Sequence, residues 1–156
     1  MNANALGKLK RRIGVNDLRA AGRARNYAYH IPFDFTSVAD GASQSVQNKV
    51  TAAAVFICYG LSGSVYDTAT GAEPVAAAAP YGSLLSKLKL SYTANEGAFM
   101  SGNVVWNGAV GSAQQPFWFA FRPVFGAGTN IVLTVYNATG KTLTGQLVFN
   151  GYLLGV

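Results

Sequence analysis

The chain has 156 residues, of which 50% are hydrophobic and 12% are charged, and it contains one His and one Cys. That length suits one domain that folds without disulfides or a metal. A zinc site needs several Cys, His or carboxylate ligands, and a Ser-His-acid triad needs a placed imidazole, so this inventory argues against an enzyme and against any metal or cofactor.

The positive charge is concentrated at the amino terminus. Residues 1–30 contain seven basic side chains and one acidic side chain, whereas residues 31–156 contain five of each and are neutral overall. We expect residues 1–26 to form an extended basic arm, because Gly7 and Gly14 interrupt an otherwise helical spacing of apolar residues. The cations expected to bind a partner are Lys8, Lys10, Arg11, Arg12, Arg19, Arg23 and Arg25.

Three kinds of partner would accept this arm. Nucleic acid would release counterions at each neutralised phosphate, although the arm has no aromatic residue to stack on bases. An acidic groove on another protein would supply counter-charges and backbone hydrogen bonds. A membrane surface would need a stronger apolar face, so we expect no membrane binding. A solvated tail without a partner is the remaining alternative.

No apolar segment indicates secretion or membrane insertion. The basic amino terminus is not followed by the apolar region of a signal peptide, and the longest apolar stretch, residues 52–59, is far shorter than the ~20 residues of a membrane helix. We therefore expect a protein made in the cytoplasm. Asn137-Ala-Thr139 matches the glycosylation acceptor pattern, which carries no weight without a secretory context.

The first strand is expected from Tyr27 to Thr36, where large apolar residues alternate with other residues. Pro32 would remove a hydrogen bond from a central strand, so this strand should lie at an edge or carry a bulge. His30 falls within the strand and is expected to be a strand or rim residue instead of a catalytic base.

The next segments are mostly apolar. After a turn at 39–43, residues 50–59 form a continuous apolar run typical of a strand covered on both faces, although its period alone does not exclude a helix. Cys58 in this run is expected to be buried and unreactive, because burial raises the pKa of a thiol. Residues 60–71 are expected to form a further strand with turns, and residues 72–80 a loop.

The remaining strands follow from the same alternation. In one of them Leu88, Leu90 and Tyr92 share a face, and Lys89 lies on the other. Seven or eight short strands separated by Gly-bearing turns indicate an all-β antiparallel sandwich of jelly-roll or Greek-key type, in one domain spanning residues 27–156. These later strands are expected at residues 84–92, 104–106, 117–121, 131–136 and 143–154.

The carboxylates and glycines do not suggest an active site. Asp34 interrupts a strand and Asp40 lies in a turn, while Asp67 and Glu73 flank a polar loop, so we expect solvated groups and no acid–base pair. The Gly126-Ala-Gly128 segment precedes a strand pattern, whereas a phosphate loop must open a helix, so a turn is expected there.

The segment from Phe117 to Phe121 is unusually aromatic. In a strand, Phe117, Phe119 and Phe121 would face one way and Trp118 the other. One face should fill the core and a second subunit could cover the other, so these four residues are a candidate subunit interface. Core packing alone would also account for them.

Several stretches of the body share a pattern of strands and turns. They are Ile31-Pro-Phe-Asp-Phe-Thr36 with Ala39-Asp-Gly-Ala, Gly111-Ser-Ala-Gln-Gln-Pro-Phe117, residues 125–140 and residues 147–154. On these stretches, which cover most of residues 30–155, the body resembles the small β-sandwich structural proteins of tailed bacteriophages. The Ala-rich residues 51–59 and 76–80 depart from the pattern, and the family offers no functional residue to carry over.

The resemblance implies a virion protein without catalysis, either a capsid decoration or minor capsid protein or a component of a vertex or spike base. Our hypothesis is a homo-oligomer, made in the host cytoplasm, that the arm anchors to the capsid or to other virion proteins. The alternatives are a tail or connector accessory protein, and a sandwich module whose arm contacts nucleic acid. A third class is a carbohydrate-binding sandwich that stacks sugars on Trp106, Trp118 or exposed tyrosines.

Overall fold

The computed structural model of the chain describes residues 27–72, 84–94, 97–98, 103–111 and 115–155. The basic arm expected at residues 1–26, with its seven cations, lies outside the described residues, as do Glu73 and most of the loop expected at residues 72–80. The elements are strands β1 Tyr27–Val38, β2 Ser43–Lys49, β3 Ala54–Asp67, β4 Leu88–Ala94, β5 Gly97–Ala98, β6 Val104–Val105, β7 Phe117–Trp118, β8 Val124–Phe125, β9 Asn130–Asn137 and β10 Leu143–Gly155, with a 3-10 turn η1 at Leu84–Lys87 and a one-turn helix α3 at Trp106–Ala109.

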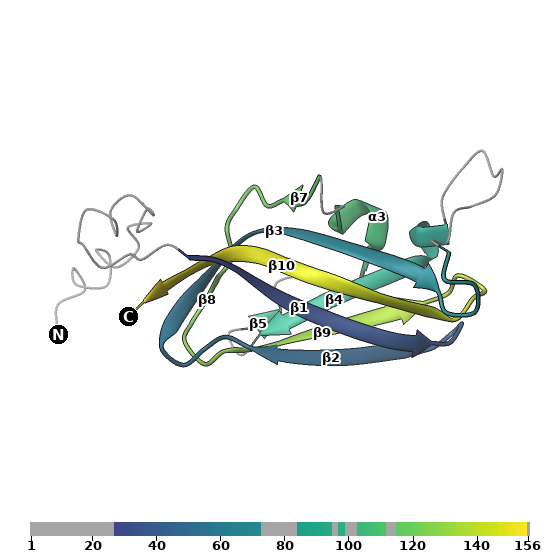
Figure 1. The fold of residues 1–156 in the computed structure, drawn as a ribbon, viewed down its shortest axis with the longest axis horizontal. Coiled ribbons are helices and arrows are strands. Elements are labelled where there is room, and N and C mark those ends of the chain that lie inside the picture. Colours follow the sequence, from purple (N-terminus) through teal and green to yellow (C-terminus); the bar gives the residue numbers. More distant parts are fainter. Residues whose placement is uncertain (1–26, 73–83, 95–96, 99–102, 112–114, 156) are drawn as a thin grey trace.

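The strands form two sheets packed face to face (Figure 1). Sheet A has the order β1-β10-β3-β7, with β8 also paired to β3, and sheet B has the order β2-β9-β4-β5, with β6 also paired to β4. Every strand pair is antiparallel. The first four strands alternate between the sheets, and β9 and β10 return beside β2 and β1, which is the jelly-roll arrangement. The expected all-β sandwich is confirmed.

Strand β1 lies at the edge of sheet A, as Pro32 predicts, and pairs with β10 from Tyr27 opposite Leu153 onward. Its register shifts between Phe35 and Val38. Side chains of β2 close its open side. The amide Nδ2 of Asn48 donates to the Pro32 carbonyl at 2.9 Å, and the Thr36 N–H donates to Gln44 Oε1 at 3.0 Å. These bonds occupy backbone groups that a further strand would otherwise use.

Several elements differ from the expectation, among them residues 84–87, which form the turn η1 in place of the start of β4. Strand β2 was not predicted, because Ser43–Lys49 is a polar strand at an exposed edge. It has no apolar face, so its sequence lacks the hydrophobic periodicity that indicates a strand. The strand expected at residues 50–59 begins only at Ala54, since residues 52–53 form a turn, and it continues without a break to Asp67. The two strands expected on either side of Gly60 are therefore one strand of 14 residues.

The core lies between the sheets and is rich in aromatic rings. Leu88, Leu90 and Tyr92 of β4 face it, as expected from their alternation. Phe149 of β10 touches Tyr92 of the opposite sheet, with ring centroids 5.1 Å apart. It also packs on Phe33 at 5.0 Å. The rings thus join the two sheets across their full separation.

Asn137, at the end of β9, holds one end of the sandwich together. Its Nδ2 donates to the carbonyls of Val38 and Lys141, and its Oδ1 accepts from the N–H and the hydroxyl of Thr139. The side chain is buried and ties the end of β1 to the β9–β10 turn. An amide engaged in this way is not available as a glycosylation acceptor in the folded protein.

Asp67 and Lys141 form an ion pair at the same end, with Lys141 Nζ 2.7 Å from Asp67 Oδ2. The hydrogen bond from Lys141, helped by the Ala69 N–H, lowers the pKa of Asp67. Because the folded protein lowers the pKa of this carboxyl group, the ion pair stabilises the fold at pH values above about 3.9, the usual pKa of Asp. This stabilisation is lost as the pH falls through the lowered pKa.

We predict that Lys141→Met is less stable than the wild type at pH 7 and that this difference shrinks on acidification, because protonated Asp67 no longer attracts the ammonium group. Urea unfolding of both proteins at pH 7 and at about pH 2 measures the difference. Lys89→Met, on the exposed face of β4, is the matched control. A stability difference that stays constant over this pH range would contradict the assigned pairing.

A candidate interface on the outer face of sheet A

A ribbon of chain, residues 115–125, follows the free edge of β3. Strand β7 pairs with Gly60 and Leu61 of β3, and β8 pairs with Phe56 and Ile57. Between them the contact is irregular, because the Phe119 N–H donates to the Tyr59 carbonyl and the Cys58 N–H to the Pro123 carbonyl, both at 2.9 Å.

A glycine at position 60 permits this approach. A Cβ there would lie 2.5 Å from the Phe117 carbonyl oxygen, closer than real side chains allow. Only two residues of the aromatic segment, Phe117 and Trp118, keep regular pairing, and the chain bends at Ala120 and Phe121.

The expectation that one face of this segment fills the core is therefore wrong for two of its residues. Phe117 is 40% exposed and Phe121 is 74% exposed, and Phe119 alone packs against the core cluster. The physical reason is the short pairing: strict alternation of faces needs a continuous strand, and the ribbon leaves the sheet after Trp118.

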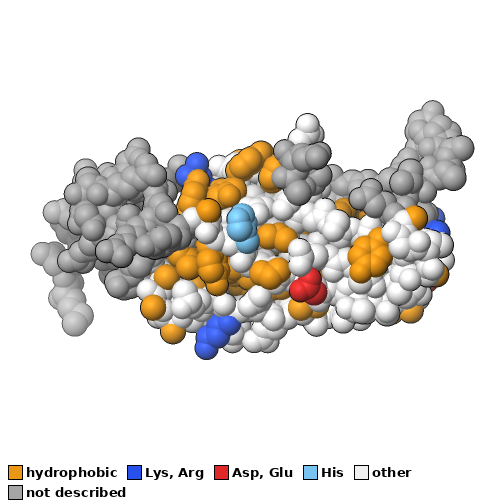
Figure 2. Space-filling model, viewed as in Figure 1, with side chains coloured by type: hydrophobic (Ala, Val, Ile, Leu, Met, Phe, Trp, Pro, Cys, Tyr) orange, Lys and Arg blue, Asp and Glu red, His pale blue; other side chains and the backbone are white. Residues whose placement is uncertain are grey.

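The ribbon concentrates the exposed apolar side chains of the described chain. Six large hydrophobic residues are exposed in the described parts of the chain. Four of them, Phe117, Trp118, Phe121 and Val124, fall within eight consecutive positions of the ribbon. Scattered exposed hydrophobic residues are normal in soluble proteins, whereas a contiguous group marks a binding surface. Figure 2 shows hydrophobic side chains gathered over the half of this face that is nearer the start of β1.

Two tyrosines extend the group across sheet A. Tyr59 stacks on Trp118 with ring centroids 5.1 Å apart and planes 23° from parallel, and it meets Tyr152 at 5.0 Å. Tyr152 and Val124 are both opposite Ile57 in the sheet register, so they lie in one row across the outer face. We call Tyr59, Trp118, Phe121, Val124 and Tyr152 the aromatic surface.

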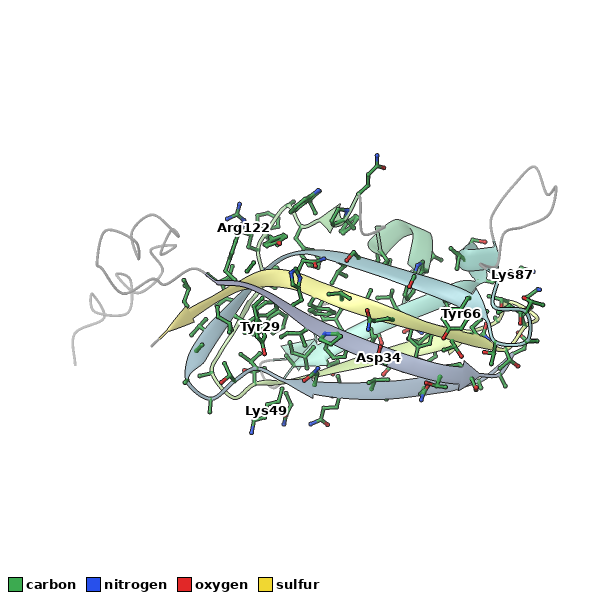
Figure 3. All side chains as sticks on the ribbon, in the orientation of Figure 1. Tyr29, Asp34, Lys49, Tyr66, Lys87 and Arg122 are labelled. Carbon is green, nitrogen blue, oxygen red and sulfur yellow. The ribbon has the colours of Figure 1, made fainter. Side chains whose placement is uncertain are left out.

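The aromatic surface contains no ionised side chain. Burial, followed by the neighbouring Tyr152 and Cys58, raises the pKa of Tyr59, so its hydroxyl stays neutral. Arg122 lies in the same ribbon, and Figure 3 shows it beyond β3 at the end of the sandwich where β1 begins. A surface of Trp, Tyr and Phe beside one Arg has the composition of protein–protein hot spots.

A polar row lies beside the aromatic surface. His30 of β1 is exposed and pairs with Asn150 of β10, and its Nδ1 donates to Asn150 Oδ1 at 2.8 Å. The Asn150 amide in turn donates to the Ser62 hydroxyl at 2.9 Å. An amide thus separates the imidazole from the hydroxyl, whereas nucleophilic catalysis needs these two groups in direct contact. His30 is a strand residue, as expected.

The other candidates from the sequence have structural roles. Cys58 is buried, and burial raises the pKa of its thiol to about 12, which keeps it protonated and unreactive. Asp34 accepts a hydrogen bond from Gln146, and Asp40 accepts from the Gly140 N–H. Gly128, with φ at 75°, completes the turn expected before β9.

Sequence reasoning included Trp118 and Phe121 among four candidate interface residues, although it placed them on opposite faces of a strand. It missed Tyr59 and Tyr152, which lie in segments expected to be strands. A Tyr within an aliphatic run is a usable signal, because its hydroxyl favours a position that reaches water. Trp106 is buried at 3% exposure and cannot serve as the sugar platform considered for it.

Within the described parts of the chain, no three His, Cys, Asp or Glu side chains gather closely enough to hold a metal ion. None of the helices described there is long and apolar enough to cross a membrane. In comparisons with known proteins, neither a family model nor a curated protein matches this sequence.

Proposed function

We propose that the protein is a non-enzymatic structural component of a bacteriophage virion, as a capsid decoration, minor capsid or vertex protein. It forms a homo-oligomer and is anchored to the capsid through residues 1–26. The observation that carries this proposal is the aromatic surface, where Trp118 and Phe121 are 61% and 74% exposed and the five named side chains carry no charge. Leaving such rings in water is unfavourable, and covering them with another subunit removes that cost.

The fold is compatible with this role. Jelly rolls occur in viral capsid and lectin domains, although a fold by itself does not define a function. The edge of β1 is occupied by the side chains of Asn48 and Gln44, so assembly by adding a strand at that edge is disfavoured. Contact through side chains on the outer face of sheet A is the mode that remains favoured.

The arm supplies the second contact. Its seven cations are accompanied by one acidic residue, Asp17, and the rest of the chain is neutral. A basic arm on a neutral domain suits attachment to an acidic surface of a neighbouring virion protein. The resemblance to phage β-sandwich proteins points to the same assembly.

Deleting residues 2–25 tests the anchoring directly. The protein lacking the arm should keep the circular dichroism spectrum of a β-sandwich and be missing from purified particles, whereas the full-length protein is incorporated. Trp118→Ala, which keeps the arm, separates the arm from the aromatic surface in the same assay. Incorporation that is unchanged by the deletion would refute the anchoring role.

The second candidate is a binding module whose arm contacts nucleic acid, and the seven clustered cations are the observation that favours it. Titration with duplex DNA at several salt concentrations distinguishes the two functions. Six or seven phosphate contacts predict a slope of about −5 to −6 for log affinity against log salt. An affinity that does not change with salt would exclude this module.

A further inference from the structure

Arginine and lysine are distributed differently along the chain. Five of the six arginines lie in residues 11–25, whereas four of the five cations in residues 31–156 are lysines. If the arm needed only positive charge, lysine would serve as well as arginine. The guanidinium group is planar and stacks on aromatic rings, which the ammonium group of lysine does not. This distribution suggests that part of the arm binds a surface on which rings are available.

In the described part of the sandwich, exposed aromatic rings are more accessible to such an arm than carboxylate groups. Its acidic groups, Asp34, Asp40 and Asp67, are each hydrogen-bonded within their own fold. Trp118, by contrast, has one face against Tyr59 and is 61% exposed, so its other face meets solvent. An exposed indole face is the strongest ring partner for a guanidinium group.

The arm also joins the sandwich beside these rings. Tyr27 pairs with Leu153, the neighbour of Tyr152, so the 26 residues before Tyr27 begin at the border of the aromatic surface. β1 begins at one end of sheet A, so the 26 residues before it are attached at that end (Figure 1). Fully extended, these residues could span roughly 90 Å.

We propose that the end of the arm nearest β1 lies across the aromatic surface of a second copy of this chain, with Arg23 and Arg25 stacked on Trp118 and Tyr152. In an extended segment, residues two apart point to the same side at a spacing of about 7 Å. Trp118 and Tyr152 both contact Tyr59, at 5.1 and 5.0 Å, so their ring centroids lie within about 10 Å of each other, which two long arginine side chains on one side of an extended segment can reach. This proposal rests on the proposed assembly function. It specifies which two surfaces, the end of the arm and the aromatic surface, join the copies.

Sedimentation equilibrium of the full-length protein and its variants tests the contact. We expect Arg23→Ala with Arg25→Ala to weaken self-association about tenfold. Lys8→Ala with Lys10→Ala removes the same charge from the other end of the arm and should change self-association less than about twofold. Trp118→Ala should weaken it as much as the arginine pair. The combined variant should be no weaker than either, because all three residues belong to one contact.

Tryptophan fluorescence provides a second readout. Trp106 is buried and Trp118 is exposed, so an emission change with protein concentration reports Trp118. The change is expected in the wild type and should move to about tenfold higher protein concentration in the arginine double variant.

Four outcomes would overturn the proposal. They are equal losses for the arginine and lysine pairs, additive losses for Trp118 and the arginines, a monomer at every concentration, and association only after duplex DNA is added. A monomer that is still incorporated into particles would refute this contact and the homo-oligomer, and it would leave the proposed virion role standing.

Discussion

Phe149→Ala is expected to reduce the free energy of unfolding by about 3–5 kcal/mol. Phe149 lies in the middle of β10, fully buried, and its ring meets Phe33 in its own sheet and Tyr92 in the opposite sheet at 5.0 and 5.1 Å. A third ring, Phe125, is 6.2 Å away. Removing the ring leaves a cavity between the two sheets that these rigid neighbours cannot fill.

Urea unfolding followed by circular dichroism measures this loss. Val148→Ala is the matched control, because Val148 is the preceding residue in β10 and points to the other face, where it is only partly buried. We expect that control to lose no more than about 1 kcal/mol. Equal losses at the two positions would contradict the assignment of Phe149 to the core.

Asn137→Ala should be comparably damaging, with a loss of about 3–5 kcal/mol, although it removes no large apolar group. The amide makes four hydrogen bonds, to the carbonyls of Val38 and Lys141 and to the N–H and hydroxyl of Thr139. Alanine leaves these buried partners unpaired, and the cost of an unpaired buried group exceeds the net gain from an ordinary hydrogen bond.

Asn48→Ala is the comparison for this prediction. Asn48 also donates from its amide to a backbone carbonyl, that of Pro32, but in an exposed setting where water can replace it. A loss of about 1 kcal/mol or less is expected there. If the urea midpoint moved as far for Asn48→Ala as for Asn137→Ala, Asn137 would not be the residue that holds this end of the sandwich.

Much of the fold was predictable because buried strands leave a periodic record. The alternation in Leu88, Leu90 and Tyr92 corresponds to a strand with one face in the core. Pro32 placed the first strand at an edge because it lacks the N–H that a central strand would need. Period and turn chemistry therefore sufficed for the class of the fold.

The elements that were predicted wrongly do not follow the hydrophobic periodicity of a buried strand. Strand β2, Ser43–Lys49, is held by backbone pairing with β9 along a wet edge, so apolar periodicity does not reveal it. The aromatic segment shows the opposite error, since it alternates like a strand and yet leaves the sheet after Trp118. Tertiary contacts with β3, through the Tyr59 and Cys58 backbone, decide its path and could not be read from local sequence.

The candidate interface was likewise only half predictable. Trp118 and Phe121 attracted attention because their segment has more rings than a core needs. Tyr59 and Tyr152, which complete the surface, come from strands 93 positions apart in the chain, and only the register of β3 against β10 brings them together. Long-range pairing of that kind has no signature in one sequence.

The central claim, that this protein is a built-in part of a virion, is tested most directly by the composition of the particles. Particles should be purified by density gradient from cells that carry the gene and analysed by quantitative mass spectrometry. The proposal predicts peptides of this chain in a constant ratio to the major shell protein across the particle fractions. Peptides confined to the soluble fractions, with none in the particles, would contradict it.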